Sequence, residues 1–168
     1  MSTNATHEST TTQQTRIEAD PNVPTIRIIR DFDATPDKVF RAWIDPELVV
    51  KWLGPKNTEM RIDEWDARTG GHYRYAALRD GAEVATFYGS FHEVRPDERL
   101  VQTFTWEGMP DGVSLDTMVF EDLGDGRTRT VGLSVVDSFE ARDGMMASGM
   151  DVGVYEGYEK LDALLAES

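Results

Sequence analysis

Six stretches with the composition of β-strands follow one another between residues 58 and 136. Turn signals rich in Gly, Asp and Pro separate them, such as Asp80-Gly81 and Gly124-Asp125-Gly126. Their short, regular spacing predicts an antiparallel meander. The six stretches are MRIDEW, HYRYAALR, EVATFYGSFHEV, RLVQTFTW, SLDTMVFEDL and RTRTVGLSVV.

Helical segments lie only before and after this run of strands. The strand TIRIIRDF (25–32) is followed by two short helices, which start at Thr35-Pro36 and at Asp45-Pro46, and Gly54-Pro55 ends the second. A long helix over about residues 139–166 closes the chain. Segregated strands and helices predict an α+β fold, in which a strongly bent antiparallel sheet wraps around the last helix.

Length and composition indicate one folded domain. The chain has 168 residues, of which 39% are hydrophobic and 10% aromatic, enough for a real core. Residues 1–22 are rich in Thr, Ser and Gln and hold almost no large apolar side chain, so we expect a disordered tail. Residues 23–168 are expected to form the domain.

The charge of the chain limits its partners. A net charge of −14, from 31 acidic and 17 basic residues, argues against nucleic acid and anionic membrane surfaces. No cysteine is present, which excludes disulfides and thiolate chemistry. The sequence contains no run of about 18 apolar residues, so we predict no membrane span. We expect a cytoplasmic, acidic protein whose charge confers solubility or suits a basic protein partner.

The hairpin at Asp80-Gly81 sets the side of the sheet that carries aromatic residues. Tyr73 and Tyr75 lie on one face of their strand, and Phe87 and Phe91 on one face of the next. These rows coincide only if the turn has an odd number of residues, and a three-residue turn with Gly in the left-handed position does this. The strand face would then be an aromatic wall.

The last helix carries an unusual glycine repeat. In GMDVGVYEGYEKLDALLA (149–166), Gly149, Gly153 and Gly157 recur every fourth residue, although each costs a helix interior about 1 kcal/mol. A helical wheel puts Gly153 and Gly157 on or beside the buried side. The missing side chains of Gly149, Gly153 and Gly157 would form a notch in the helix. This notch either lets the helix backbone approach the sheet or leaves a hollow between helix and sheet.

A ligand pocket is the main functional hypothesis from these patterns, with a filled core as the alternative. Ligand sites are mostly apolar with few polar anchors, and tyrosine hydroxyls supply such anchors. The candidate ligand-binding residues are Trp52, Tyr73, Tyr75, Phe87, Phe91, Phe104, Trp106, Met118, Met146, Met150 and Val154.

No catalytic or metal-binding motif is apparent. His7 lies in the expected tail, and the parity of His72 and His92 places both on wet strand faces, without any metal-ligand spacing. Asp116 shares the parity of Met118, but we interpret it first as a solvated strand residue. The same holds for three further charged candidates, Arg74, Glu107 and Arg129. No metal or other cofactor is predicted, and enzymatic activity stays open.

Several motifs together resemble a known family. They are FDATPDKVFRAWIDPELVVKWLGP, GGHYRY (70–75), GSFHEVRPDERLVQTFTW (89–106) and the glycine-bearing tail. They resemble the START-like (SRPBCC, Bet v 1-like) superfamily, and within it the bacterial branch named after the activator of heat-shock protein 90 ATPase. The resemblance covers about residues 25–166. One departure is Trp52-Leu53, where the family often has two tryptophans before Gly-Pro.

The resemblance implies a helix-grip fold, in which a curved antiparallel sheet of about six to seven strands holds the C-terminal helix with a pocket between them. Members of the START-like superfamily bind lipids, sterols, polyketides or other apolar molecules, and the resemblance implies a ligand of this kind. We therefore expect an apolar or aromatic small-molecule ligand and a monomer or homodimer. One alternative is a chaperone-interacting stress adaptor, since residues 97–125 hold eight acidic residues against one basic. The other is a cyclase- or hydrolase-type enzyme.

Overall fold

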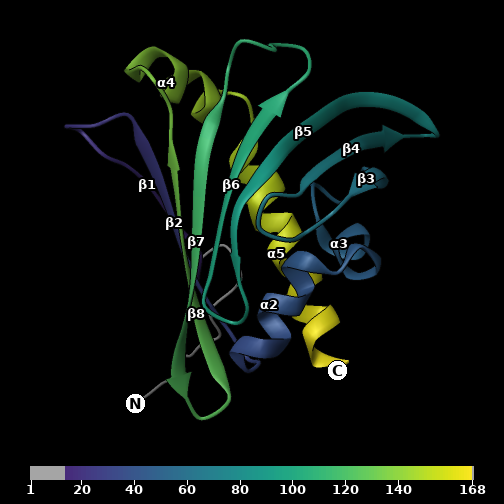
Figure 1. The fold of residues 1–168 in the computed structure, drawn as a ribbon, viewed down its shortest axis with the longest axis vertical. Coiled ribbons are helices and arrows are strands. Elements are labelled where there is room, and N and C mark those ends of the chain that lie inside the picture. The colour runs from purple at the N-terminus through teal and green to yellow at the C-terminus, as the bar shows by residue number, and fades with distance from the viewer. Residues whose placement is uncertain (1–13, 168) are drawn as a thin grey trace, which may run out of the picture.

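A single antiparallel sheet organises the protein, whose computed structural model describes residues 14–167. Its eight strands run in the order β1-β2-β8-β7-β6-β5-β4-β3 (Figure 1). The strands are β1 (Arg16–Ala19), β2 (Thr25–Phe32), β3 (Glu59–Trp65), β4 (His72–Arg79), β5 (Ala82–Arg95), β6 (Arg99–Trp106), β7 (Ser114–Gly124) and β8 (Arg127–Val135). The predicted α+β class and the meander from β3 to β8 are thereby confirmed.

The sheet has more strands than the six to seven expected. The additional strand, β1, lies inside the segment that we expected to be a tail, and it pairs with β2 through Ile17 and Ile28. Four residues with one large apolar side chain carry too little pattern to be recognised as a strand. The ordered chain therefore begins before residue 22, and residues 1–13 of the expected tail lie outside the described residues.

In the β4–β5 hairpin the aromatic residues of both strands lie on one face, as predicted, but the turn differs from the predicted one. Tyr75 lies opposite Phe87, so the aromatic rows do coincide. The turn itself has two residues, Asp80 and Gly81, with φ of 53° and 82°, as a type I′ turn requires. A bulge that leaves Val84 unpaired supplies the odd offset instead of a third turn residue.

The two short helices begin where the prolines predicted. They are α2 (Pro36–Ile44) and α3 (Pro46–Trp52). Asp45 ends the first helix and caps the second, because its side chain accepts a hydrogen bond of 2.9 Å from the Glu47 N–H.

The expected long C-terminal helix is two helices, α4 (Phe139–Ala147) and α5 (Met150–Ala166). The chain breaks at Gly149, whose φ of 90° is left-handed and therefore incompatible with a continuous helix. The prediction of one helix over 139–166 was wrong for this reason. The first glycine of the repeat therefore starts α5 and is no part of a notch.

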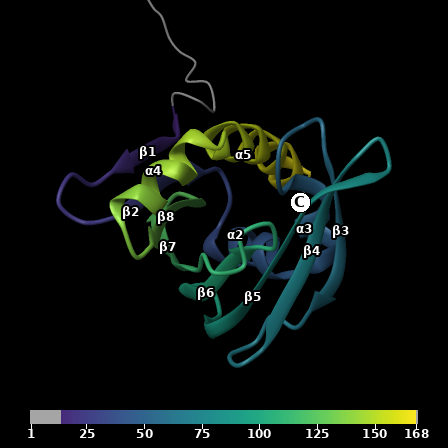
Figure 2. The ribbon, with the colours of Figure 1, turned by 90° about the horizontal axis from the view of Figure 1, so that it is seen from above.

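Helices cover one side of the curved sheet. Figure 2 shows the sheet as an arc, with α5 running across its opening and α2 and α3 lying inside it. Tyr158 of α5 meets three aromatic rings, with centroid distances of 5.3 Å to Phe32, 5.9 Å to Trp43 and 6.1 Å to Trp52. This cluster joins α5 to both short helices and to β2, and with Leu161 it forms the centre of the core.

The remaining glycines of the repeat face α3 and not the sheet. A β-carbon on Gly157 would lie 3.0 Å from the Trp52 carbonyl oxygen, closer than ordinary packing allows. A β-carbon on Gly153 would meet only the Pro55 ring, at 3.7 Å. The expected approach to the sheet is thus replaced by an approach of α5 to the end of α3.

A buried arginine fixes α5 against the sheet. Arg30 of β2 is fully buried and donates two hydrogen bonds, of 2.8 and 2.6 Å, to the carboxylate of Asp162 on α5. Its guanidinium also lies over the Phe32 ring, 4.6 Å from the centroid. A buried guanidinium without its carboxylate would be costly, so this pair restricts the position of α5 along the sheet.

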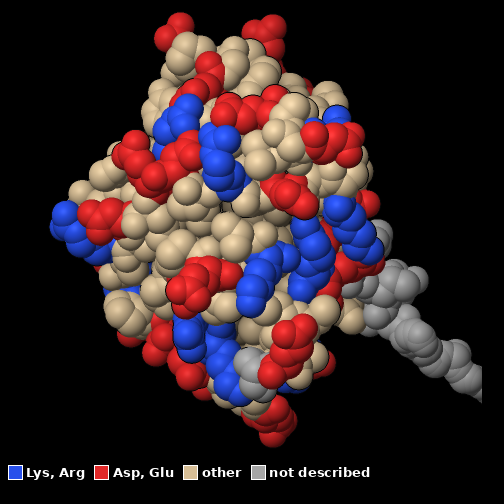
Figure 3. All heavy atoms as spheres, turned by 90° about the vertical axis from the view of Figure 1, so that its right-hand side faces the viewer, with Lys and Arg blue, Asp and Glu red and all other residues tan. Residues whose placement is uncertain are grey.

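The surface carries both signs of charge. On the face shown in Figure 3, basic and acidic side chains are interspersed. Ion pairs such as Arg61–Asp63, Arg74–Glu107 and Lys56–Glu159 illustrate this mixing. None of the helices in residues 14–167 combines the length and the apolar character that crossing a membrane requires.

The two helix glycines are expected to respond differently to the same substitution. Gly153→Ala should stabilise the protein by up to about 1 kcal/mol, because alanine favours the helix and the space is free. Gly157→Ala gains the same propensity but must displace the Trp52 carbonyl, so it should be at least about 1 kcal/mol less stable than Gly153→Ala. Urea unfolding of both variants measures the difference, and equal stabilities would contradict the close approach.

Candidate functional site

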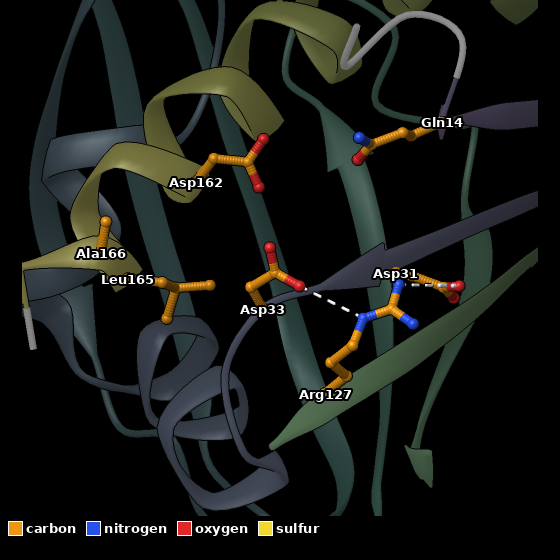
Figure 4. Close-up of a pocket in the computed structure, with 7 residues that line it drawn as sticks. All are labelled: Gln14, Asp31, Asp33, Arg127, Asp162, Leu165 and Ala166. Carbon is orange, nitrogen blue, oxygen red and sulfur yellow. Dashed lines mark hydrogen bonds and ion pairs between the residues drawn. The ribbon is translucent and has the colours of Figure 1, made fainter. Parts of the chain in front are cut away.

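Two hollows are candidates for a site. The larger, of about 530 Å³, lies between the end of α5 and the strands β2 and β8 (Figure 4). Its lining is mainly charged, and Arg127 donates a hydrogen bond of 3.2 Å to Asp33 and lies 3.7 Å from Asp31. It also borders Gln14, where the described chain begins. Paired charges beside the undescribed segment give little basis for a small-molecule site.

The smaller hollow is a cavity of about 140 Å³ inside the arc of the sheet. It lies between the two short helices and the concave face, and no α5 side chain lines it. The expected pocket beneath the C-terminal helix is therefore displaced towards α2 and α3. The lining residues are Trp43, Val49, Trp52, Leu53, Trp65, Tyr73, Tyr75, Leu100, Gln102, Asp116 and Met118.

Two tryptophans fix the wall formed by the helices. The Trp52 indole N–H donates to the Ala42 carbonyl over 2.9 Å, and the Trp65 indole N–H donates to the Ile44 carbonyl over 2.7 Å. Both bonds end on the last turn of α2, so α3 and β3 are tied to the same helix. With these donors satisfied, the rings contribute mainly apolar surface to the cavity.

The opposite wall comes from the tyrosines of β4. The Tyr73 hydroxyl donates to the Thr103 carbonyl over 2.7 Å and accepts from the Gln102 amide over 3.1 Å. Gly89, directly opposite Tyr73, makes this possible, since a β-carbon there would lie 2.0 Å from the Thr103 oxygen and 2.7 Å from the hydroxyl. Burial raises the pKa of Tyr73 and Tyr75 well above the usual value, so both keep their protons.

A carboxyl group completes the cavity. Asp116 of β7 lies between Gln102 of β6 and Ser134 of β8 in the strand register. The Ser114 hydroxyl donates to it over 3.0 Å. Burial raises the pKa of Asp116, against the opposing effect of hydrogen bonds from Ser134 and Ser114. Asp116 is half-buried and lines the cavity, which differs from our first interpretation of it as a solvated strand residue; its parity with Met118 was the available signal.

The structure brings together four of the eleven candidate ligand-binding residues, namely Trp52, Tyr73, Tyr75 and Met118. Phe91 is buried in the core, and Phe87, Phe104 and Val154 pack against its edge. Trp106 is 46% exposed at the end of β6, and Met146 and Met150 are half-buried away from the cavity. The candidates that do not line the cavity mostly belong to the packed core.

Seven lining residues were absent from the predicted set: Trp43, Val49, Leu53, Trp65, Leu100, Gln102 and Asp116. Trp43 follows Val39 and Phe40 at the spacing of one helix face, and this pattern was a usable signal. The meeting of α2 with β3 and β7 was not visible, because contacts between distant segments leave no periodicity in the sequence.

The other ionisable candidates lie on the surface. His72 and His92 are exposed as expected, and the His72 Nε2 lies 2.7 Å from Glu64. Arg74 pairs with Glu107 and Arg129 with Asp31. Among residues 14–167, His, Asp and Glu side chains form no group of three or more that is suited to a metal ion.

Asp116→Asn should change how stability depends on pH. A carboxyl with a raised folded pKa binds its proton more tightly in the folded state, so stability falls as pH rises from the unfolded value of about 4 through the folded pKa. Ionised Asp116 therefore costs stability at neutral pH, and the variant should gain melting temperature relative to wild type at pH 7.5 more than at pH 4. Each kcal/mol corresponds to about 2–4 °C.

The control is Glu121→Gln, which removes an exposed acid from the same strand. Its difference from wild type should be similar at both pH values. An equal difference at pH 4 and pH 7.5 for Asp116→Asn would contradict the desolvated carboxyl.

Comparison with solved structures shows the same architecture in bacterial proteins. A protein from Arthrobacter aurescens is 27% identical, with a TM-score of 0.82 over 91% of this chain and 92% of its own. A protein from Rhodobacter sphaeroides is 25% identical, with a TM-score of 0.81 over 91% of this chain and 100% of its own. A protein from Chromobacterium violaceum is 28% identical, with a TM-score of 0.72 over 84% and 96%.

Family comparison agrees with the motifs in the sequence. No curated protein matches the chain significantly. The family model described as activator of Hsp90 ATPase homolog 1-like protein matches residues 33–166, which include α2, α3, the whole meander and α5. The chain belongs to the family of activator of Hsp90 ATPase homolog 1-like proteins, within the START-like (SRPBCC) superfamily.

Proposed function

We propose that this protein binds an apolar or aromatic small molecule in the cavity between α2, α3 and the sheet. The observation that carries the proposal is the composition of the lining. Five aromatic side chains surround the cavity, and one carboxyl group, that of Asp116, also faces it. A concave, mostly aromatic site with few polar groups is typical of small-molecule binding. The START-like superfamily is compatible with this function.

The size of the cavity limits the ligand. A space of about 140 Å³ is close to that of the engineered cavity of about 150 Å³ that binds benzene. One aromatic ring, or the terminal part of a larger molecule, fits such a space. A whole lipid or polyketide would require the surrounding side chains to move apart.

The position at which the chain departs from the family pattern offers a test. Leu53 lines the cavity, and Leu53→Trp should fill it. At a hundredfold excess over the dissociation constant, a single-ring ligand should stabilise wild type by about 2.7 kcal/mol, or roughly 5–10 °C. Thermal-shift measurement should show this gain lost in Leu53→Trp.

Val50→Trp is the matched control, because Val50 lies on α3, which Leu53 caps, but is exposed. It should keep the response to ligand. If a screen of single-ring compounds stabilises neither wild type nor Val50→Trp, the proposed binding function is wrong.

Acid–base catalysis is a second candidate, favoured by the buried carboxyl in the cavity. A carboxyl beside a bound substrate can accept or donate a proton, and such a group typically contributes about 10²–10⁴-fold in rate. This matches the cyclase- or hydrolase-type alternative.

Mass spectrometry of ligands incubated with the protein tests this candidate. At a saturating concentration of substrate, Asp116→Asn should lose at least about 100-fold in turnover. Binding without any turnover in wild type would leave the protein a binding module.

A chaperone partner is the remaining candidate. Seven of the eight acidic residues in 97–125 are exposed, and only Asp116 is turned inward to the cavity. Exposed acidic side chains suit a basic protein surface. Co-purification with the host chaperone tests this, and an absence of binding at low salt would end it.

A further inference from the structure

The charged side chain that lines the cavity is acidic, and the other lining residues are uncharged. Five aromatic residues, five other uncharged residues and Asp116 surround the space, and no Arg, Lys or His of residues 14–167 lines it. The neighbours of Asp116 are also uncharged at neutral pH: Ser114 and Ser134 donate hydrogen bonds, and Tyr73 and Tyr75 keep their protons. The carboxylate therefore has hydroxyl donors but no counter-ion.

Asp116 is half-buried, and withdrawing a carboxylate from water without a counter-ion is energetically unfavourable. Hydrogen bonds from serine hydroxyls offset part of this cost, but a cation offsets more, because it adds a direct Coulomb attraction in a poorly screened environment. A cavity lined by this carboxylate thus favours a ligand that brings a positive charge. An anionic ligand would instead meet like charge with no basic side chain to hold it.

The aromatic walls favour the same sign. The electron-rich faces of Trp and Tyr attract cations, and Trp does so most strongly. Trp43, Trp52 and Trp65 all line the cavity, and the N–H groups of Trp52 and Trp65 are already bonded to main-chain carbonyls. The Tyr73 hydroxyl is likewise bonded to the Thr103 carbonyl. Most hydrogen-bond donors that an anion would need are therefore already bonded to main-chain carbonyls. The aromatic ring faces are still available to contact a cation.

We propose that the ligand class of this cavity is a small organic amine in its ammonium form, with the nitrogen bound by the Asp116 carboxylate and one ring or branched apolar group among the tryptophans and tyrosines. The inference rests on the proposed binding function and specifies its ligand. The volume of about 140 Å³ suits one ring with a short amine arm.

Three single-ring probes of similar size separate this inference from its alternatives. Benzylamine, benzyl alcohol and benzoate share one ring but differ in charge. Isothermal titration at pH 7.5 and physiological salt should show that benzylamine binds at least tenfold more tightly than benzyl alcohol, and that benzoate binds most weakly. Asp116→Asn should remove the preference by weakening benzylamine at least tenfold and benzyl alcohol less than threefold.

Two further measurements exclude trivial explanations. Glu121→Gln removes an exposed negative charge from the same strand, so it controls for general attraction of cations to an acidic protein, and it should leave the preference intact. Lowering the pH towards 4 should weaken benzylamine, because Asp116 becomes neutral; Tyr73 and Tyr75, the other titratable groups facing the cavity, do not change charge in this range. Circular dichroism confirms that each variant is folded.

The outcomes distinguish a failure of the amine inference from a failure of the proposed binding function. If benzyl alcohol binds as tightly as benzylamine, or if Glu121→Gln loses the preference as Asp116→Asn does, the amine inference is overturned and the binding function stands. A benzyl alcohol affinity that rises as pH falls would instead identify protonated Asp116 as a hydrogen-bond donor to neutral ligands, and overturns the inference in the same way. If none of the three probes binds wild type, the inference is overturned, and the independent single-ring screen with Leu53→Trp then decides the binding function.

Discussion

The bidentate pair between Arg30 and Asp162 is the interaction on which the arrangement of the helices depends. It joins β2, the second strand from one edge of the sheet, to α5 across 132 residues of sequence, with the guanidinium fully buried. Because a buried guanidinium cannot be left without its carboxylate, α5 has little freedom to slide. The close approach at Gly157 then brings the end of α3 against α5. The position of Trp52, and hence one wall of the cavity, follows from these two contacts.

This arrangement explains why the cavity lies under the short helices and not under α5. The inner side of α5 is occupied by Tyr158 and Leu161, which pack into the aromatic cluster with Phe32 and Trp43. The shorter helices cover the sheet less completely, and a space remains between Trp43, Trp65 and the tyrosines of β4. Asp116 faces that space and is half-buried, so among residues 14–167 it is the one carboxyl that lines the cavity.

Local patterns predicted the elements well. TIRIIRDF and RLVQTFTW coincide with β2 and β6, and the prolines at 36 and 46 begin α2 and α3. The site was predicted in part, because Trp52, Tyr73, Tyr75 and Met118 share faces that alternation or helical spacing reveals. Trp106 and Met150 were misplaced, since parity gives the face of a strand or helix but not the distance from the cavity along it.

The sequence by itself determined the α+β class, the meander, the family and the aromatic character of the inner face, because each depends on periodicity, turn residues or short motifs that act over a few residues. Only the tertiary structure decided that Gly157 brings α5 close to the end of α3, that Gly149 divides the last helix, and that Asp116 lines a cavity. These properties arise where segments distant in sequence meet. The burial of a carboxyl depends on every neighbour that excludes water from it, and no local pattern records those neighbours.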